Sequence, residues 1–381
     1  MRKLAFITGT RADYGLIRPV LKAVAQRPEY RLQLIALGTH ALPHYGYTLD
    51  AITQDGFTCD AVLDTFVDTA NGKEIALSTA RATAACAESF AQMQPDLVVI
   101  TGDRYEMLGA ATAALMMHVP IAHLYGGDVT EGALDDAIRH AITKMAGLHF
   151  CTTAQARQRL LQMGEAPERI IVSGSPALDV LADLPRLSRE ALEQRLGVAL
   201  RETNILVTFH PVTRERDSSE QLEALLAALA QLDAGHLVLF TMPNADQNGE
   251  QMAARIQAFA AQHAQMHFIA SLGHPYYLQA LQHMQMVVGN SSSGLYEVPS
   301  MHIPTVNIGS RQKGRLKAAS VIDAAPNTAS ILDAIAQAAR LDCSQAVNPY
   351  GDGTATKKIL AAFDAIADFS TLCQKPFYDS I

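Results

Sequence analysis

Strand-length apolar runs alternate with amphipathic, Ala-rich stretches along most of the chain, and this alternation limits the possible fold more than any other feature. The first series of runs comprises 4–8, 32–37, 97–101, 121–124, 148–151 and 170–172, and the second comprises 205–209, 237–240, 267–269, 286–288 and 305–308. Strands that are apolar along their whole length and separated by helices form parallel sheets covered on both faces. The pattern predicts an α/β protein with two doubly wound parallel sheets.

The length of 381 residues also favours two domains, because single hydrophobic cores stop growing below this size. A break near Gly174-Ser175-Pro176 predicts a first domain at 1–174 and a second domain from 175. Ligands of such sheets bind beyond the carboxyl ends of the strands, so the residues that follow each run are the candidates for function.

Charge and cysteine content exclude several functional classes. The net charge of −8 argues against a nucleic-acid partner. Five scattered cysteines without CxxC spacing predict neither a disulfide framework nor a metal site, and they fit a reducing cytoplasm. Residues 107–127 lack Lys, Arg, Asp and Glu, but Pro120 and the pair Gly126-Gly127 interrupt them, which predicts a buried helix and strand instead of a membrane span.

The segment 289–297, Gly-Asn-Ser-Ser-Ser-Gly-Leu-Tyr-Glu, follows an apolar run and carries the strongest single signal for binding. Small residues after a strand let backbone N–H groups close around a phosphate, and the hydroxyls of Ser291 and Ser292 supply further donors. The Glu297 carboxylate could accept hydrogen bonds from ribose hydroxyls. The alternative is that the serines only cap a helix.

Charged side chains also follow the runs of the first half. Arg11 could hold a phosphate, because a guanidinium matches phosphate oxygens; the alternative is a surface pair with Asp13. Asp103, beside Arg104, could act as a general acid or base, or it could cap a helix.

The paired glycines that precede Asp128 and Glu131 suggest close approach of the backbone to a ligand, or else a flexible turn. Farther on, Asp135 and Arg139 are i,i+4 neighbours, as are Asp136 and His140; these pairs could equally serve helix stability alone.

Three strand-end segments of the second half complete the candidates. His210 could exchange protons near neutral pH, or it could be a structural histidine. Asn244 follows another run. Segment 308–315 places Arg311, Lys313 and Arg315 together, which indicates an anion site or a solvated basic face.

These motifs together resemble the UDP-N-acetylglucosamine 2-epimerase family, and most closely its hydrolysing branch of sialic and legionaminic acid synthesis. The matching segments are TGTRADYG at 8–15, GTHALPHYG at 38–46, GDRYE at 102–106, GGDVTEGALDDAIRHAITKM at 126–145, FHPVT at 209–213, GNSSSGLYEVPS at 289–300 and NIGSRQKGR at 307–315. The resemblance spans essentially the whole chain in the family's order.

The resemblance implies a GT-B-like fold of two Rossmann-like domains facing each other across a nucleotide-sugar cleft. The second domain would then be 175–354, and 355–381 would hold a C-terminal helix that packs back on the first domain. The implied protein is cytoplasmic, forms a homodimer or homotetramer, and uses no cofactor or metal.

The implied reaction eliminates the nucleoside diphosphate from C1 as the C2 proton leaves, giving a 2-acetamidoglucal. Water then adds and releases N-acetylmannosamine or a derivative. By the resemblance, Asp103 and Asp135 share proton transfer, and His210 and Arg11 stabilise the leaving group. The matched nucleotide or sugar contacts are His40, Arg104, Asn244, Ser291, Ser292, Glu297 and Arg311.

One position departs from the family's pattern. Many members carry a Glu two residues after the strand-end His, where this chain has Tyr125 after His123. Asp128, Glu131 and the Tyr125 phenol are the candidates for the missing acid. Three alternative functions stay open at this point: a non-hydrolysing epimerase, a GT-B glycosyltransferase and a nucleotide-sugar-binding regulator without turnover.

Overall fold

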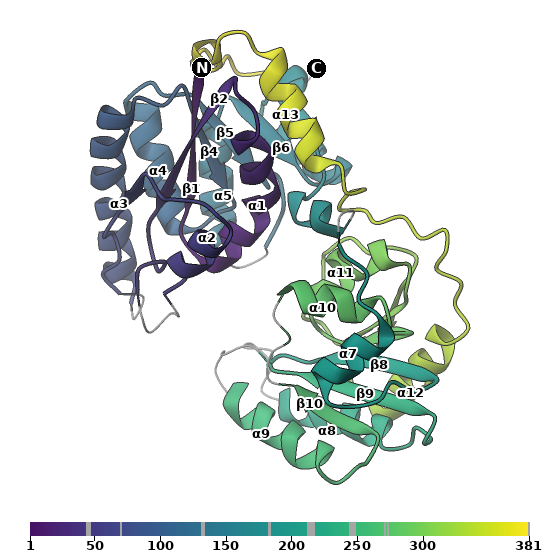
Figure 1. The fold of residues 1–381 in the computed structure, drawn as a ribbon. Coiled ribbons are helices and arrows are strands. Elements are labelled where there is room, and N and C mark those ends of the chain that lie inside the picture. The colour runs from purple at the N-terminus through teal and green to yellow at the C-terminus, as the bar shows by residue number, and fades with distance from the viewer. Residues whose placement is uncertain are drawn as a thin grey trace. The chain divides into compact units, whose positions relative to one another are not determined.

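The computed structural model describes the chain except for residues 43–46, 69–70, 131–133, 182–183, 212–217, 244–248, 270–271, 273 and 380–381. The chain forms two compact units (Figure 1). Unit 1 comprises Met1–Val180 and Tyr350–Ile381, and unit 2 comprises Leu181–Pro349. Each unit contains one parallel sheet, which confirms the predicted α/β class.

The sheet of unit 1 has the strand order β3-β2-β1-β4-β5-β6-β7. Its strands are β1 (Arg2–Thr8), β2 (Tyr30–Ala36), β3 (Ala61–Val62), β4 (Leu97–Thr101), β5 (Ile121–Leu124), β6 (Leu148–Cys151) and β7 (Ile170–Val172). All neighbours are parallel, and Leu4 of β1 lies opposite both Leu32 and Leu97. The chain order reverses between β1 and β4, so the topological switch point of this sheet lies there.

The helices of unit 1 are α1 (Arg11–Ala25), α2 (Leu49–Gln54), α3 (Gly72–Met93), α4 (Tyr105–Met116), α5 (Leu134–Met145), α6 (Ala154–Gln162) and α13 (Ala355–Ala365), with 3-10 turns η2 (Pro167–Arg169), η3 (Pro176–Leu181) and η5 (Phe369–Cys373). Several begin at side-chain caps: Thr10, Asn71 and Thr153 each accept a hydrogen bond from the backbone N–H three residues on. Such caps satisfy N–H groups that have no partner inside the helix.

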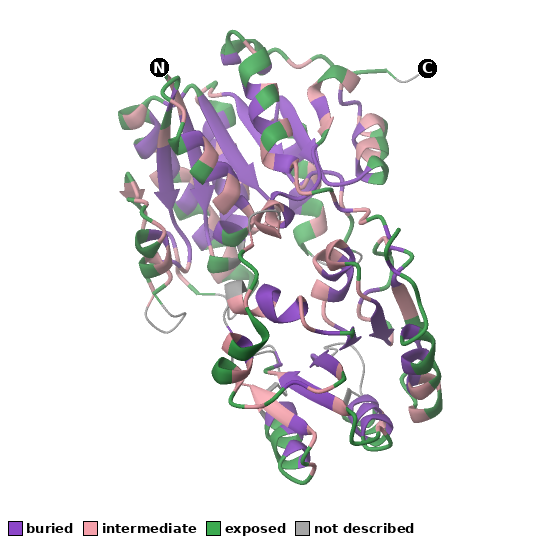
Figure 2. Cartoon of the chain, turned by 45° about the vertical axis from the view of Figure 1, so that its right-hand side comes forward, coloured by how far each residue is buried: buried purple, intermediate pink, exposed green. Residues whose placement is uncertain are grey.

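The core of unit 1 lies on both faces of its sheet, whose central strands β4, β5 and β6 are buried along their length (Figure 2). Successive side chains of β1 point to opposite faces, so Leu4 and Phe6 join one core cluster and Ala5 and Ile7 join the other.

The C-terminal helix α13 belongs to this core. Its Ile359, Leu360 and Phe363 lie in the same cluster as the inner face of α1. The Phe363 ring meets the Phe150 ring edge to face at 5.5 Å between centroids. The Arg2 guanidinium donates to the carbonyls of Phe363 and Ile366 at 3.0 and 2.7 Å, at the end of the helix.

The sheet of unit 2 has the order β10-β9-β8-β11-β12-β13, and its switch point lies between β8 and β11. Its strands are β8 (Thr203–Thr208), β9 (His236–Thr241), β10 (Met266–Ile269), β11 (Met286–Gly289), β12 (Thr305–Ile308) and β13 (Val321–Ala324). Its helices are α7 (Arg189–Leu196), α8 (Ser218–Leu229), α9 (Gly249–Ala260), α10 (His274–Leu281), α11 (Ser293–Tyr296) and α12 (Thr328–Ala338), with the 3-10 turn η4 (Val298–Met301).

The predicted strands are confirmed, with differences at their ends. Strands β4, β5, β6, β7 and β12 have the predicted bounds, and the others differ by one or two residues at an end. β3 and β13 were not predicted. The apolar stretch at 107–127 contains most of α4 and all of β5, as expected. Within the described chain, every helix is too short or too polar to cross a membrane.

Candidate functional site

The switch point of unit 1 brings together the loops after β1 and β4. Arg11 begins α1 and is exposed. Arg104 immediately precedes α4, and its guanidinium donates to both carboxylate oxygens of Glu106, Nε to Oε2 at 3.1 Å and Nη2 to Oε1 at 2.8 Å. Because Glu106 is buried, this two-point pair holds the Arg104 guanidinium in a fixed plane. The residue that caps α4 is Arg104, so the alternative of an Asp103 cap is wrong.

Asp13 is a buried acid at this switch point, with 8% of its surface exposed. The alternative of a surface pair with Arg11 is therefore wrong. Its Oδ2 atom receives no hydrogen bond from the described residues. Burial raises the pKa of Asp13 to about 6, although the Arg104 charge opposes the rise.

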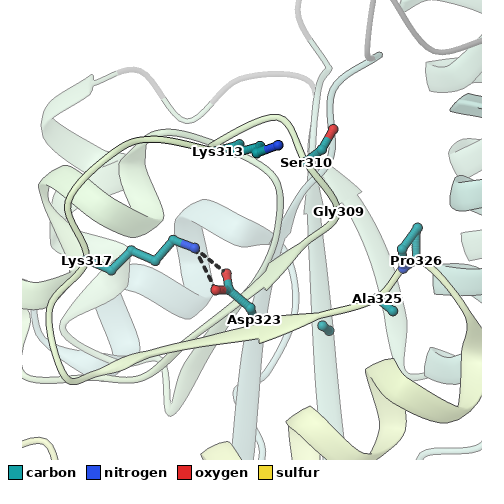
Figure 3. A pocket seen from close by; sticks show the side chains of 8 residues that line it. Gly309, Ser310, Lys313, Lys317, Asp323, Ala325 and Pro326 are labelled. Carbon is teal, nitrogen blue, oxygen red and sulfur yellow. Dashed lines mark hydrogen bonds and ion pairs between the residues drawn. The ribbon is translucent and has the colours of Figure 1, made fainter. Parts of the chain in front are cut away.

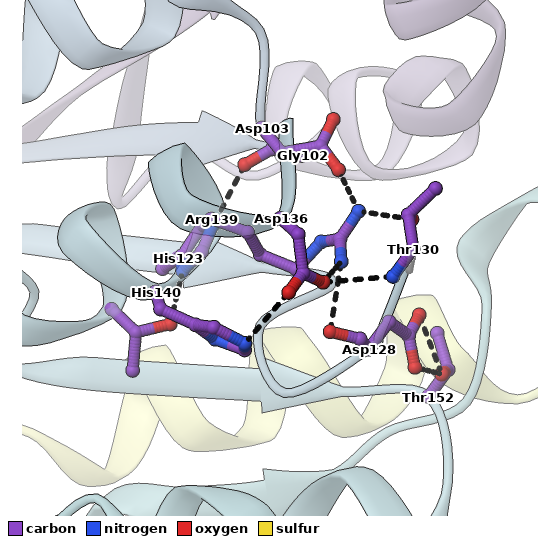
Figure 4. A network of polar contacts seen from close by, with 10 residues as sticks. Gly102, Asp103, His123, Asp128, Thr130, Asp136, Arg139, His140 and Thr152 are labelled. Atoms are coloured by element: carbon purple, nitrogen blue, oxygen red, sulfur yellow. Dashed lines mark hydrogen bonds and ion pairs between the residues drawn. The ribbon is translucent and has the colours of Figure 1, made fainter. Parts of the chain in front are cut away.

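Arg139 of α5 is the centre of a polar network that joins the ends of three strands (Figure 4). Its guanidinium pairs with Asp103 after β4 and donates to the Asp136 carboxylate at 3.1 Å. It also donates to the Asp128 carbonyl at 2.8 Å and to the Thr130 hydroxyl at 2.9 Å, both in the loop after β5. The side chain is only 6% exposed, so these contacts are largely shielded from water.

A neutral histidine supports the turn that carries Asp103. His123 is fully buried, and burial lowers its pKa to about 3. Its Nε2 lies 2.8 Å from the Gly102 carbonyl, which can only accept, so Nε2 carries the proton. Its Nδ1 then accepts from the Thr143 hydroxyl at 3.1 Å. The imidazole therefore fixes the backbone just before Asp103.

The predicted carboxylates of unit 1 differ in their surroundings. Asp103 is held by Arg139. Asp135, in the first turn of α5, has an exposed side chain, yet loss of surrounding water and then the Asp103 charge raise its pKa. Asp128 lies 3.3 and 3.4 Å from the Thr152 hydroxyl through its two carboxylate oxygens. Glu131 lies outside the described residues.

Two sequence interpretations around the loop after β5 change. Gly127 has φ +82°, and a Cβ there would lie 2.4 Å from the Ala156 carbonyl, so its close approach is to helix α6. The Tyr125 hydroxyl lies 2.9 Å from the Ser175 hydroxyl. The phenol that could have replaced the missing acid thus already has a hydrogen-bond partner within unit 1. The predicted pair of Asp136 and His140 is present at 3.7 Å.

His40 follows strand β2 of the unit 1 sheet and is 1% exposed. Its two ring nitrogens are within 2.9 Å of the Thr8 hydroxyl and 2.8 Å of the Thr48 hydroxyl. Burial lowers its pKa to about 4, so the ring is neutral at physiological pH. Because protein hydroxyls engage both nitrogens, its place in the family's sugar-side motif is better explained by support of the loop.

The switch point of unit 2 carries His210 after β8 and the serine loop after β11. His210 is 6% exposed, and its backbone is hydrogen-bonded to the Asn290 side chain. Ser292 stands at the start of α11 but makes no capping hydrogen bond through its side chain. Ser291 Oγ accepts from the Ser293 N–H at 3.4 Å. The capping alternative therefore does not account for Ser292.

Glu297 ends α11, and its Oε2 atom is buried without a hydrogen-bond partner among the described residues. Burial raises its pKa, while a hydrogen bond with Ser293 opposes the rise. Ser293 Oγ also accepts from the hydroxyl of the half-buried Tyr277 at 2.9 Å. An unsatisfied carboxylate oxygen beside a serine-rich loop is suited to accept hydroxyl donors from a ligand.

The basic segment after β12 divides between two surroundings. Arg311 Nη1 donates to the Asn290 carbonyl at 3.2 Å. Lys313 and Ser310 instead line a pocket of about 440 Å³, across which Lys317 pairs with Asp323 at 2.6 Å (Figure 3). This pocket lies toward β13, away from the serine loop. Asn244 lies outside the described residues.

Arg139 and Asn290 are among the residues that support these sites but were not predicted as site residues. Only Arg139 had a signal, its spacing from Asp135, and that signal indicated the wrong ion-pair partner. Asn290 stands inside the serine motif, but the sequence interpretation of that motif considered only the serine hydroxyls and Glu297. Within the described chain, no group of three His, Cys, Asp or Glu side chains is placed to hold a metal ion.

Comparison with known proteins decides the family. The family model for UDP-N-acetylglucosamine 2-epimerase matches residues 22–364. The chain belongs to the UDP-N-acetylglucosamine 2-epimerase family. It is 36% identical over 330 residues to the GDP/UDP-N,N'-diacetylbacillosamine 2-epimerase (hydrolyzing) of Campylobacter jejuni, covering 86% of this chain and 85% of the relative.

Other relatives of the family extend over the full length. The UDP-N,N'-diacetylbacillosamine 2-epimerase (hydrolyzing) of Legionella pneumophila is 33% identical and covers 98% of this chain and 99% of its own. The UDP-GlcNAc 2-epimerase of Neisseria meningitidis, solved bound to UDP-GlcNAc, superposes with a TM-score of 0.79 at 17% identity, over 96% of this chain and 100% of that chain. The predicted GT-B-like fold is thus confirmed.

Proposed function

We propose that this family member is a hydrolysing nucleotide-sugar 2-epimerase. It eliminates the nucleoside diphosphate from C1 of a 2-acetamido sugar nucleotide as the C2 proton leaves. Water then adds to the resulting 2-acetamidoglucal, and the C2-epimerised free sugar is released. The product would be N-acetylmannosamine or its derivative, a precursor for nonulosonic acid biosynthesis.

One observation carries this proposal: both sheets place their candidate residues at the topological switch point. Arg11 and Asp103 follow β1 and β4, and His210 and Ser291 follow β8 and β11. Open parallel sheets bind ligands at such points, because the loops there diverge toward opposite faces and leave room between them. The hydroxyl-rich serine loop belongs to unit 2, and the candidate carboxylates Asp103 and Asp135 belong to unit 1.

The leaving group would be stabilised by preformed charges and donors. We assign the diphosphate to His210, Arg11, Arg311 and the hydroxyls of Ser291 and Ser292, and the sugar nucleotide's ribose to Glu297. The buried, unsatisfied Oε2 of Glu297 supports the last assignment. Fixed dipoles and charges aimed at a departing anion lower the barrier without reorganisation in the transition state.

Asp103 and Asp135 would share proton transfer at C2 and in hydration. Asp135 is better suited to exchange a proton, because its raised pKa brings it closer to neutral pH. Asp103 forms an ion pair with Arg139. It would orient the sugar within that pair, and it would accept the proton only if the pair breaks. The Arg104 guanidinium, held by its two hydrogen bonds to Glu106, would contact the sugar or the nucleotide. Asp128 and Glu131 remain the candidates for the third acid.

The substrate would be UDP-N-acetylglucosamine or a UDP- or GDP-linked 2,4-diacetamido-6-deoxy analogue. Two relatives above 30% identity carry names for N,N'-diacetylbacillosamine, and a third is named for UDP-N-acetylglucosamine, so both sugars enter the test. We expect a homodimer or homotetramer of this chain.

The test is incubation with UDP-N-acetylglucosamine and with UDP- and GDP-2,4-diacetamido-2,4,6-trideoxyglucose in deuterated water. We expect release of the nucleoside diphosphate, together with a free manno-configured sugar that carries deuterium at C2. An intact nucleotide sugar with inverted C2 would instead indicate non-hydrolysing epimerisation. Tight binding without exchange at C2 would indicate a regulator.

A further inference from the structure

Asn290 is the point at which three strand-end loops of unit 2 meet. It directly follows β11 and is fully buried. Its side-chain Oδ1 accepts from the His210 N–H at 2.7 Å, and its Nδ2 donates to the His210 carbonyl at 2.8 Å. Both ends of one carboxamide are therefore committed to the backbone of a single residue on the neighbouring strand end.

This pairing extends the contact between β8 and β11 beyond the last residues that the two strands pair through their backbones. The β8 and β11 strands end with Thr208 opposite Gly289, and the Asn290 N–H still donates to the Thr208 carbonyl at 3.2 Å. Gly289 has φ +144°, and a Cβ there would lie 2.0 Å from the Thr208 carbonyl oxygen. At a switch point the following helices leave toward opposite faces, so backbone pairing cannot continue. The Asn290 side chain takes its place.

The loop after β12 is tied to the same residue. The Asn290 carbonyl accepts from Gln312 Nε2 at 2.8 Å and from Arg311 Nη1 at 3.2 Å. Gln312 is 1% exposed, and its Oε1 in turn accepts from Arg315 Nη1 at 2.8 Å. Asn290 thus connects the backbone that carries His210 with the side chain of Arg311.

A carboxamide suits the His210 pairing because it carries a donor and an acceptor in every protonation state. The side chain must present one acceptor and one donor toward a backbone N–H and C=O on the same edge. A carboxylate of the same shape would keep the first hydrogen bond and place an anionic oxygen against the His210 carbonyl. An alanine would leave both backbone groups buried without a partner, which is costly.

We propose that Asn290 is a positioning residue for the reaction: it holds the His210 imidazole and the Arg311 guanidinium in one arrangement around the departing diphosphate and touches no substrate atom itself. This proposal rests on the proposed function. It adds a residue that would act on turnover through the His210 backbone and the Arg311 side chain.

The test compares Asn290→Asp and Asn290→Ala with Asn204→Ala. Asn204 is a matched control, since it is 3% exposed, lies at the opposite end of β8 and hydrogen-bonds Arg201 and Gln285 through its side chain. We expect both Asn290 variants to lose kcat by roughly 100-fold, the scale of an ångström-sized misplacement. Asn204→Ala should stay within about threefold of wild type even if its melting temperature falls equally.

The pH profile separates positioning from general damage. An ionised carboxylate at position 290 would add a negative charge beside the site and should move the pH dependence of kcat to higher pH, whereas Asn290→Ala should not move it this way. Wild-type kcat in Asn290→Ala would overturn the proposal. So would an equal loss of kcat in Asn204→Ala.

Amide hydrogen exchange tests the hydrogen bonds between the Asn290 side chain and the His210 backbone independently of turnover. We expect the His210 amide to exchange at least about tenfold faster in Asn290→Ala than in Asn204→Ala, because its acceptor is gone. Unchanged protection at His210 would refute the pairing of Asn290 with His210. If wild type releases no sugar from any nucleotide sugar, but the His210 amide exchanges faster in Asn290→Ala, the proposed function fails and the pairing stands.

Discussion

Replacing Arg139 with methionine tests whether the network around it stabilises unit 1 as well as placing Asp103. Methionine keeps an apolar stem of similar length but removes every donor of the guanidinium. The Arg139 side chain is 6% exposed, while the Asp103 and Asp136 side chains are 23% and 28% exposed. The two carboxylates would lose their counter-charge in a site that water reaches only in part.

The magnitude follows from these exposures. Removing one partner of a fully buried ion pair costs about 3–5 kcal/mol. Because about a quarter of each carboxylate side chain is exposed, water offsets part of that cost, and we expect about 2–3 kcal/mol. For a unit of this size, each kcal/mol lowers the melting temperature by roughly 2–4 °C. The variant should therefore melt roughly 5–10 °C below wild type.

Scanning calorimetry at neutral pH measures this, with Asp103→Asn and the double variant completing a cycle. The double variant should be less destabilised than the sum of the single changes, because the two residues share one pair. Arg139→Lys should recover part of the loss, since the charge remains but the forked geometry does not. A melting temperature for Arg139→Met within 1 °C of wild type, or strictly additive effects, would refute the reasoning.

Three further outcomes follow from the sites. Asp103→Asn should leave nucleoside diphosphate affinity nearly unchanged but remove most turnover; a wild-type rate would exclude proton transfer by this residue. Ser292→Ala and Glu297→Ala should each weaken nucleoside diphosphate binding by about 1–3 kcal/mol in titration calorimetry, and unchanged affinity in both would exclude the serine loop from the site. Asp13 binds its proton more tightly in the folded state, with a pKa raised from 3.8 to about 6, so its contribution to stability is full below about pH 4 and is lost as the pH rises through 6. Asp13→Asn should therefore gain about 3 kcal/mol over wild type between pH 4 and 7 in the free energy of unfolding; equal pH dependence of the two proteins would contradict this.

Apolar runs predicted most strands because a strand covered on both faces needs apolar side chains throughout. The ends extend into polar residues at Tyr30-Arg31 and Thr203-Asn204, since parallel pairing uses the backbone and tolerates any side chain there. The unpredicted β3 (Ala61–Val62) and β13 (Val321–Ala324) are edge strands, as are the predicted β7 and β10. β3 has only two residues, and β13 is interrupted by the exposed Asp323, so neither forms an apolar run of strand length.

The position of candidate side chains next to strand ends was predictable, as for Asp103, His210 and Ser292. Contacts between residues far apart in the sequence were not predictable. Arg139 reaches Asp103 across 36 positions, although local spacing favoured Asp135. The Asn290 pairing with His210 spans 80 positions and depends on strand order, which the pattern alone does not specify.

The two units differ in how the chain supplies their cores. Unit 2 is one continuous segment, whereas unit 1 takes α13 from the last part of the chain, and Phe363 of that helix packs against Phe150. During synthesis, every residue of unit 2 emerges from the ribosome before Ile359, Leu360 and Phe363 do. The later unit can thus mature first, and the earlier one waits with an uncovered apolar surface on α1, the stage at which a nascent chain is most exposed to chaperones and to aggregation.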